Sequence, residues 1–242
     1  MRIEIAPEVF ALFPDYVRHV LVVRGADNSR ELPELAELLL EEQRRIREND
    51  AFEDVKQHPL IASWRDAFQA FGVNPNKCPP SIANLIKRVR GGKDLPYVNS
   101  LVAIFNVVSM RHVLPAGGDD LDAVKGDIRL TPARGNENYT PLGSPDQREH
   151  PNPGEIVLLD TGNEGNEGNE EVFCRAWCWK NGDVSKIEAG TRNVAINIDA
   201  LPPKSAEEGK KAATETMELV KRFCGGEVGL YRLESSNGRI TF

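Results

Sequence analysis

The chain has 242 residues, of which 40% are hydrophobic and 28% are charged. This composition is typical of a folded, water-soluble protein, and it excludes a disordered chain, a fibre and a disulfide-stapled miniprotein. The formal net charge is −7, so the chain as a whole lacks the basic balance of a general nucleic-acid binder. No apolar run approaches the length of a membrane span, and residues 1–5 alternate as a strand rather than as a signal peptide. We therefore expect a cytoplasmic protein.

The first half of the chain is predicted to be mostly helical. Two strands come first, over residues 2–6 and 17–24. Apolar residues then recur at helical spacing in four segments, with Ser29 as the expected N-cap of the first and Gly91 as the stop of the third. The predicted helices cover about 29–49, 59–71, 81–90 and 98–112. The last of them is apolar nearly all round, which is typical of a buried helix.

From Gly126 onward the pattern changes to a period of two, with turn residues between the runs. It predicts antiparallel strands over 127–130, 155–160, 172–180 and 194–198. The three-residue repeat at 162–170 is expected to form a flexible, exposed hairpin loop. An amphipathic helix over 205–223 and a short C-terminal strand complete the chain. We therefore predict an α+β fold with antiparallel-rich β-sheets packed with helices, in one composite domain.

The four cysteines are few and scattered, which favours reduced thiols in a cytoplasmic protein. The run from 172 to 180 alternates, so Cys174 and Cys178 are expected on one face of a strand. A zinc site needs two more ligands, and neither Cys78 nor any histidine offers a suitable spacing. We expect no metal and no cofactor.

Positive charge is concentrated in one segment of this acidic chain. Residues 67–118 carry a net charge of +5, and the remainder carries −12. The cluster of Lys87, Arg88, Arg90 and Lys93 lies at the end of a predicted helix. These side chains either stabilise the helix dipole on a solvated face or form a local surface for a polyanion.

Polar side chains interrupt the buried helix on one face. Asn99 and Asn106 lie seven residues apart, so both project from the same side. Buried carboxamides need hydrogen-bond partners, so they either tie down neighbouring loops or line a ligand pocket. Gly117 and Gly118 follow the helix, and their backbone N–H groups could face a ligand. Asp120 either caps the next turn or contacts the same ligand.

No familiar catalytic motif is present. The chain has no nucleophile elbow, no His-Glu-x-x-His, no phosphate-binding loop and no dinucleotide fingerprint. The loop at 135–143 joins two predicted strands and carries one carboxylate, Glu137, which is a weak indication of general-base chemistry.

These segments together resemble the B3/B4 domain family. Its members are the editing domain in the β subunit of bacterial phenylalanyl-tRNA synthetase and free-standing homologues of that domain. The resemblance runs from about Trp64 to about Asp199. The stretches that carry it are 80–89, 95–106, 115–120, 126–128, 135–143, 154–160, 175–177 and 191–199. It implies a B3/B4-like domain over 59–242, with residues 1–58 as a small N-terminal α/β extension packed on it.

The resemblance implies hydrolytic proofreading. The family's domain accepts the 3′ end of a tRNA that carries the wrong amino acid and cleaves the ester. Because an aminoacyl ester is already activated, a site that positions one water and stabilises the oxyanion suffices. By resemblance, Asn99, Asn106, Gly117 and Gly118 are the catalytic candidates. A family recognition carboxylate matches either Asn197 or Asp199.

The remaining roles follow from the same resemblance. Asp120 and Glu137 join Asn197 and Asp199 as expected substrate-binding residues. The basic cluster from Lys87 to Lys93 is the expected tRNA-binding surface.

The sequence departs from the family pattern at three places. Gly117 stands where the synthetase has a histidine, Ala103 stands where it has an aspartate, and Asn136 lengthens its Gly-Glu motif by one residue. The amino acid that is removed is therefore left open.

Three hypotheses result. The first is a free-standing deacylase that hydrolyses mischarged aminoacyl-tRNA in trans. The second is a tRNA-binding module without catalysis. The third is an amino-acid-binding protein that reuses the fold.

Overall fold

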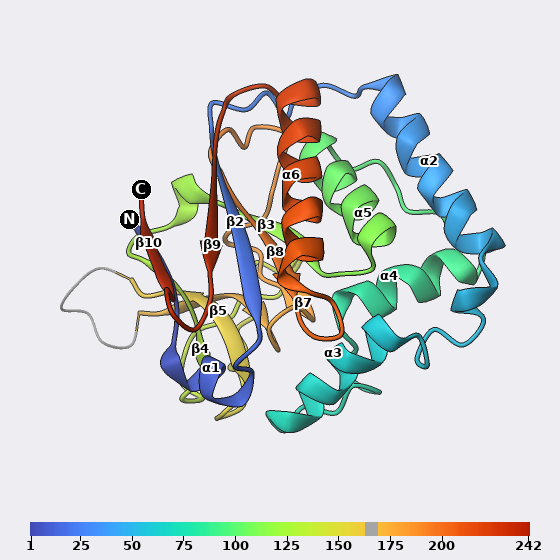
Figure 1. Cartoon of the computed structure of the whole chain (residues 1–242). Helices are drawn as coiled ribbons and strands as arrows, with labels where there is room; N and C mark the ends of the chain where they lie inside the picture. The colour runs from blue at the N-terminus through green and yellow to red at the C-terminus, as the bar shows by residue number, and fades with distance from the viewer. Residues whose placement is uncertain (163–168) are drawn as a thin grey trace.

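Two β-sheets built from distant parts of the chain organise the structure, a computed structural model that describes residues 1–162 and 169–242. The first sheet has the order β10 (Arg239–Thr241), β1 (Arg2–Ile5), β4 (Ile128–Pro132), β5 (Ile156–Asp160), β6 (Glu171–Arg175), β7 (Lys180–Asn181). The second sheet has the order β3 (Ala116–Asp120), β8 (Val194–Ala200), β2 (Val17–Arg24), β9 (Glu227–Leu233). All neighbouring strands are antiparallel except β1 and β4. The two ends of the chain lie side by side in β1 and β10 (Figure 1).

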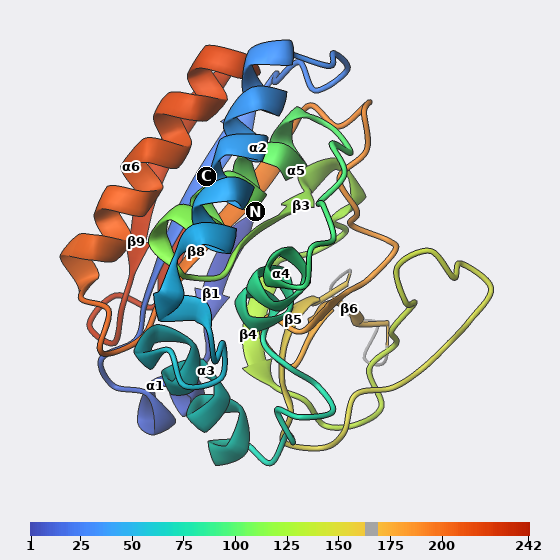
Figure 2. The same cartoon turned by 90° about the vertical axis from the view of Figure 1, so that its right-hand side faces the viewer.

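Six α-helices accompany the sheets in the described part of the chain: α1 (Pro7–Leu12), α2 (Pro33–Glu48), α3 (Pro59–Ala70), α4 (Ser81–Arg90), α5 (Ser100–His112) and α6 (Ala206–Phe223). Short 3₁₀ turns occupy 50–52 and 121–123. Helices α5 and α6 pack on the second sheet, and α2 and α4 pack in turn on α5 (Figure 2). None of the helices in the described ranges is long and apolar enough to cross a membrane.

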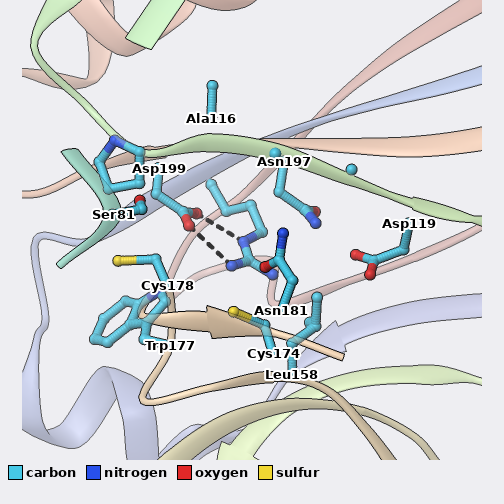
Figure 3. A pocket seen from close by; sticks show the side chains of 14 residues that line it. Ser81, Ala116, Asp119, Leu158, Cys174, Trp177, Cys178, Asn181, Asn197 and Asp199 are labelled. Atoms are coloured by element: carbon cyan, nitrogen blue, oxygen red, sulfur yellow. Dashed lines mark hydrogen bonds and ion pairs between the residues drawn. The ribbon is translucent and has the colours of Figure 1, made fainter. Parts of the chain in front are cut away.

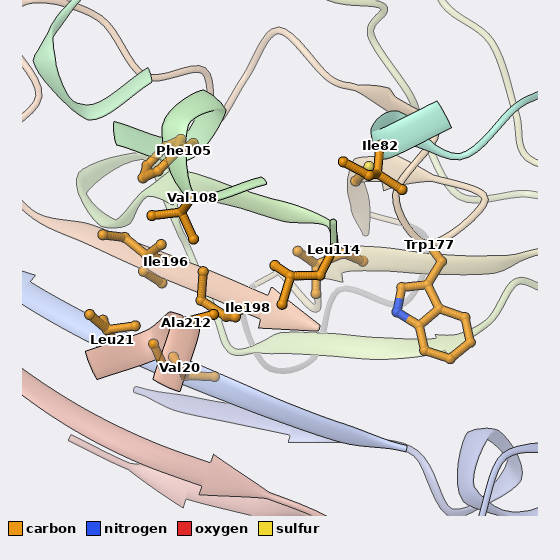
Figure 4. Close-up of a cluster of buried hydrophobic side chains, with 14 of the residues drawn as sticks. Val20, Leu21, Ile82, Phe105, Val108, Leu114, Trp177, Ile196, Ile198 and Ala212 are labelled. Carbon is orange, nitrogen blue, oxygen red and sulfur yellow. The ribbon is translucent and has the colours of Figure 1, made fainter. Parts of the chain in front are cut away.

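The main core lies between the second sheet and its helices. Strands β2 and β8 are interior strands, and nearly all their side chains are buried on both faces, which explains why most of their residues are apolar. Figure 4 shows Ile196 and Ile198 of β8 against Phe105 and Val108 of α5 and Ala212 of α6. On the other face of this sheet, Asn197 and Asp199 of β8 are directed toward Leu158 of β5 and Cys174 of β6.

The predicted α+β class and the antiparallel-rich sheets are confirmed, as are the helices predicted near 59–71, 81–90, 98–112 and 205–223. The expected N-cap Ser29 is wrong, because the helix begins at Pro33, whose ring suits the first helical position. Ser29 instead donates to Asp27 in a turn. Of the predicted loop at 162–170, residues 163–168 lie outside the described residues.

The predicted strand over 172–180 ends early, at Arg175. Ala176 and Trp177 have left-handed backbones, with φ of 44° and 65°. The buried Glu155 carboxylate fixes this turn, since it accepts hydrogen bonds from the Ala176 N–H and from the Arg175 guanidinium. Cys178 therefore does not share a strand with Cys174, although both thiols are free.

Candidate functional site

Gly117 and Gly118 form part of β3, an edge strand of the second sheet. Side chains alternate along a strand, so the two glycines face opposite ways. A Cβ added at Gly118 would come within 2.8 Å of the Phe105 ring, which explains the glycine. A Cβ added at Gly117 would meet no atom within 4 Å, because this position borders open space.

One backbone donor of β3 has no acceptor in the described part of the chain. The N–H groups of Ala116 and Asp120 point away from β8, to the Ser109 hydroxyl and the Ser185 carbonyl. Every second residue of an edge strand directs its N–H outward, so Gly118 shares this edge. The Gly118 N–H therefore lies free beside the cavity that the strand borders.

That cavity, which we call the outer chamber, has a volume of about 570 Å³. Its lining comes from α5, from β3, from the N-terminus of α4 and from the loops around 142–143 and 181–189. Val98 and Leu142 belong to the lining and are 62% and 50% exposed. The chamber therefore has an apolar rim.

All four residues predicted as catalytic line the outer chamber: Asn99, Asn106, Gly117 and Gly118. The two asparagines differ in their hydrogen bonds. Asn99 is the N-cap of α5, since its Oδ1 accepts from the Val102 N–H and its Nδ2 donates to the Ile187 carbonyl. The Asn106 side chain makes no hydrogen bond within the described ranges, so its carboxamide is available to a ligand.

A smaller cavity of about 80 Å³, the inner recess, adjoins the outer chamber (Figure 3). Six residues line both cavities: Ser81, Ala116, Gly117, Gly118, Asp119 and Asn181. The recess lies between the two sheets, with Asn197 and Asp199 of β8 on one side and Leu158 and Cys174 on the other.

A buried ion pair forms one wall of the recess. Arg18 of β2 and Asp199 of β8 are directly opposite in the strand register. Arg18 Nε and Nη2 donate to the two carboxylate oxygens at 2.7 and 2.9 Å, and the Tyr16 hydroxyl donates to Asp199 Oδ1 at 2.6 Å. Although burial opposes the charge, the Asp199 carboxylate holds the pKa of Arg18 above its usual value. Burial also raises the pKa of Tyr16.

Asp119 lies at the junction of the two cavities. It is 8% exposed and accepts a hydrogen bond from the Ser185 hydroxyl at 2.7 Å. Burial raises the pKa of Asp119 to about 6, although the Ser185 bond and the positive charge of Arg18 oppose this shift. The carboxyl group is therefore ionised at neutral pH and protonated in mild acid.

The two cysteines of the recess are uncharged at neutral pH. Burial raises the pKa of Cys178 to about 12 and that of Cys174 well above its usual value. Neither thiol is thus prepared for nucleophilic attack. Within the described residues, no group of three or more His, Cys, Asp or Glu side chains is placed to hold a metal ion.

Two of the predicted substrate-binding residues lie outside both cavities. Asp120 caps the 3₁₀ turn after β3 and accepts from the Thr191 hydroxyl at 2.7 Å. The Glu137 carboxylate accepts from the N–H groups of Arg134 and Gly135 and so fixes its own loop. The other two, Asn197 and Asp199, line the inner recess.

The basic cluster lies at the C-terminal end of α4, whereas Ser81 at its N-terminal end lines the outer chamber. A helix of ten residues separates the two by about 15 Å. Arg88 donates to the Asp94 carbonyl and Arg90 to the Arg47 carbonyl, so both guanidinium groups stabilise the local backbone. The other two members of the cluster, both lysines, are exposed.

Comparison with known proteins identifies the family. The model of the B3/4 domain matches residues 63–225, which is more than half of the chain. The chain belongs to the B3/4 domain family. The predicted resemblance to the B3/B4 domain is thereby confirmed.

Relatives of this B3/4 domain are phenylalanyl-tRNA synthetase subunits. The phenylalanine–tRNA ligase β subunit of Ruegeria pomeroyi is 28% identical in an alignment 183 residues long, which covers 62% of this chain. The match covers 22% of that subunit, so the chain spans about a fifth of the length of its curated relative. The crystal structure of an N-terminal fragment of the phenylalanyl-tRNA synthetase β subunit from Pyrococcus horikoshii is also similar. The superposition covers 93% of this chain and 49% of the fragment, with 14% sequence identity and a TM-score of 0.45.

Sequence reasoning did not single out Arg18, Asp119 or Asn181, although all three line the recess. Arg18 lies within a buried and mostly apolar strand, and a charge inside such a strand indicates a paired or functional group. That indication was present in the sequence. Asp119 and Asn181 could not be distinguished from ordinary turn residues without the fold.

Proposed function

We propose that this B3/4 domain binds the aminoacylated 3′ end of a tRNA in the outer chamber and hydrolyses the ester of mischarged tRNA in trans. One observation carries the proposal. Two donors that have no acceptor among the described residues, the Gly118 N–H and the Asn106 carboxamide, border a chamber of about 570 Å³ that continues into a polar recess. Pockets with a few convergent polar groups in a mostly apolar wall are typical of ligand sites.

The reaction needs little from the protein, because the substrate ester is already activated. A water molecule in the chamber attacks the ester carbonyl carbon, and the carbonyl oxygen becomes an oxyanion. The Gly118 N–H and Asn106 Nδ2 donate to that oxygen, and such donors are worth about 3–4 kcal/mol each in comparable sites. The bond to the ribose oxygen then breaks, and the proton lost by the attacking water neutralises the leaving ribose oxygen.

The position of Asp119 favours a role in orientation. Its carboxylate is negative at neutral pH and lies where the chamber meets the recess. The α-ammonium group of an aminoacyl ester is the cation nearest the reacting carbonyl, so an ion pair with Asp119 would direct the amino-acid side chain into the recess. Fixed orientation of this kind contributes strongly to rate.

The rim and the basic helix end suit the remainder of the tRNA. The exposed apolar side chains of Val98 and Leu142 offer a surface for the face of the terminal base. Exposed Lys87 and Lys93, about 15 Å away along α4, can contact phosphates of the same strand.

The direct test is a deacylation screen over a panel of misacylated tRNAs. Hydrolysis of at least one of them is expected. Gly117→Val should abolish it without unfolding the protein, because the new side chain extends into the open space beside β3. Gly190→Val is the matched control, since this glycine also has free space around it but lines neither cavity.

The outcomes separate the three hypotheses. Absence of turnover on every tRNA with folded protein refutes hydrolysis. Salt-dependent tRNA binding without turnover would then indicate a binding module. Binding of a free amino acid without tRNA affinity would indicate a small-molecule binding protein.

A further inference from the structure

The inner recess contains a charged donor that the protein leaves unused. Two of the three guanidinium nitrogens of Arg18 bind Asp199, but Nη1 is buried and has no hydrogen-bond partner in the described part of the chain. The whole side chain is 2% exposed and forms part of the recess wall. A buried donor of a charged group without an acceptor costs free energy, so an acceptor that enters the recess is stabilised there.

A second polar group in the same recess is also unused. Asn197 is 8% exposed, lines the recess and makes no side-chain hydrogen bond within the described ranges. It lies two residues before Asp199 on β8, on the same face of the strand. Figure 3 shows the Asn197 and Asn181 side chains extending into the recess beside the Asp199 ion pair. The recess thus offers one charged donor and two carboxamides, each of which both donates and accepts.

Charge restricts what can occupy this site. The Arg18–Asp199 pair is neutral as a unit, both thiols hold their protons, and the negative charge of Asp119 at the junction is assigned to the α-ammonium group of the substrate. An anionic group would face the carboxylates of Asp199 and Asp119, whereas a cationic group would face the guanidinium of Arg18. Both are disfavoured where water is largely excluded. A neutral group with an oxygen acceptor can accept a hydrogen bond from Nη1 without placing a further charge in the recess.

We infer that the inner recess is a selectivity site for an aminoacyl side chain that carries a neutral oxygen, either a hydroxyl or a carboxamide. This inference rests on the proposed function, because it places the side chain of the substrate in the recess. The oxygen accepts from Arg18 Nη1, and its hydrogens donate to Asn197 or Asn181. The volume of about 80 Å³ holds about two or three water-sized groups, which suits a short side chain.

A site built this way rejects apolar analogues more strongly than an apolar pocket rejects polar ones. An alkyl side chain in the recess would leave the Arg18 donor and the buried Asn197 carboxamide without partners and without water. We therefore expect serine to be preferred over alanine, threonine over valine and asparagine over leucine. A hydrogen bond to a charged group corresponds to about a tenfold to hundredfold preference in each pair.

The experiment measures binding of 3′-aminoacylamino-adenosines, in which a stable amide replaces the ester. The panel contains the three matched pairs together with aspartyl and lysyl analogues. Titration calorimetry gives a dissociation constant for each analogue, and deacylation of the corresponding misacylated tRNAs is measured in parallel. Binding therefore tests the recess, and turnover tests hydrolysis.

Two variants test the residues. Arg18→Lys keeps the charge opposite Asp199 but removes the unused donor, and Asn197→Leu removes one carboxamide of similar volume. In each variant, the ratio of the dissociation constants of the apolar and the polar analogue of a pair should fall toward one. The apolar analogue should bind as tightly as before or more tightly. Asn84→Leu is the control for the second variant, because Asn84 is exposed on α4 and lines neither cavity.

The results distinguish this inference from the proposed function. A hydroxyl or carboxamide preference that Asn197→Leu abolishes supports the recess even when no tRNA is deacylated. Turnover of mischarged tRNA with equal binding of both members of each pair overturns the recess and leaves hydrolysis intact. Tightest binding of the aspartyl, lysyl or apolar analogues, or no binding of any analogue by folded protein, also overturns it. If Arg18→Lys does not fold, Asn197→Leu alone decides, since the Asn197 side chain makes no hydrogen bond to any residue in 1–162 or 169–242 that the variant would lose.

Discussion

Replacing Asp119 with asparagine should stabilise the folded protein at neutral pH and have little effect in acid. Burial raises the pKa of this carboxyl group from its ordinary 3.8 to about 6. Below pH 4 the folded and unfolded chains both hold the proton, so the group has no effect on stability. Between pH 4 and 6 the unfolded chain loses the proton while the folded chain retains it, and stability falls as the pH rises. Above pH 6 the loss is complete.

The magnitude follows from the size of the shift. About two pKa units at 1.36 kcal/mol each correspond to about 3 kcal/mol at pH 7.5. Asparagine retains an oxygen for the Ser185 hydroxyl but carries no charge, so the variant lacks this pH-dependent term. Urea unfolding of both proteins from pH 4 to pH 8 measures the difference. Asp122→Asn, at an exposed position outside both cavities, provides the control.

Parallel curves for the two proteins across this pH range would refute the reasoning, because the Asp119 carboxyl would then not be held away from water. A destabilised variant at pH 8 would do the same. A gap that opens between pH 4 and pH 6 and then stays constant would support it.

Three further predictions follow from local contacts. Gly118→Ala should lower the unfolding free energy by about 1–3 kcal/mol, whereas Gly117→Ala should change it by less than about 0.5 kcal/mol. Urea unfolding of the two variants measures this difference. Equal effects would contradict the assignment of the two glycines to opposite faces of β3. Ser205→Ala removes the capping box of α6 and should cost about 1 kcal/mol, measured the same way; an unchanged midpoint would show that the cap contributes nothing. Charge reversal at Lys87 and Lys93 should weaken tRNA binding and reduce the slope of log affinity against log salt concentration by about two. Binding of the adenosine analogues should not change. An unchanged slope would show that these two lysines do not contact the tRNA.

The strands and helices with regular apolar periodicity were predictable from the sequence, and the irregular segments were not. Helices over 59–71 and 205–223 follow from spacing and caps that act within a few residues. By contrast, β3 has the sequence AGGDD, which has low strand propensity. It forms a strand because β8 offers it a paired edge and because the Phe105 ring fills the space that a side chain at Gly118 would need.

The candidate site shows the same division. Asn106 and the glycine pair were identified because polar and flexible residues beside an apolar helix are unusual. For Asn99, hydrogen bonds to neighbouring backbone were the alternative to a ligand-binding role. The structure shows such bonds, since its carboxamide ties the start of α5 to a loop. Arg18 lies far from these residues in sequence, and only the pairing of β2 with β8 brings it into the recess. Tertiary register of this kind is not encoded in local periodicity.

The interior position of β2 has a practical consequence for how this protein should be handled. The family match begins at residue 63, yet β2 is hydrogen-bonded to strands on both sides and supplies Arg18 to the recess. A truncated clone that starts at the match would leave β8 and β9 without the strand that joins them, and Asp199 without its counter-ion. Surveys that align only the matched segment of relatives would likewise overlook one of the side chains that defines what the cavity accepts.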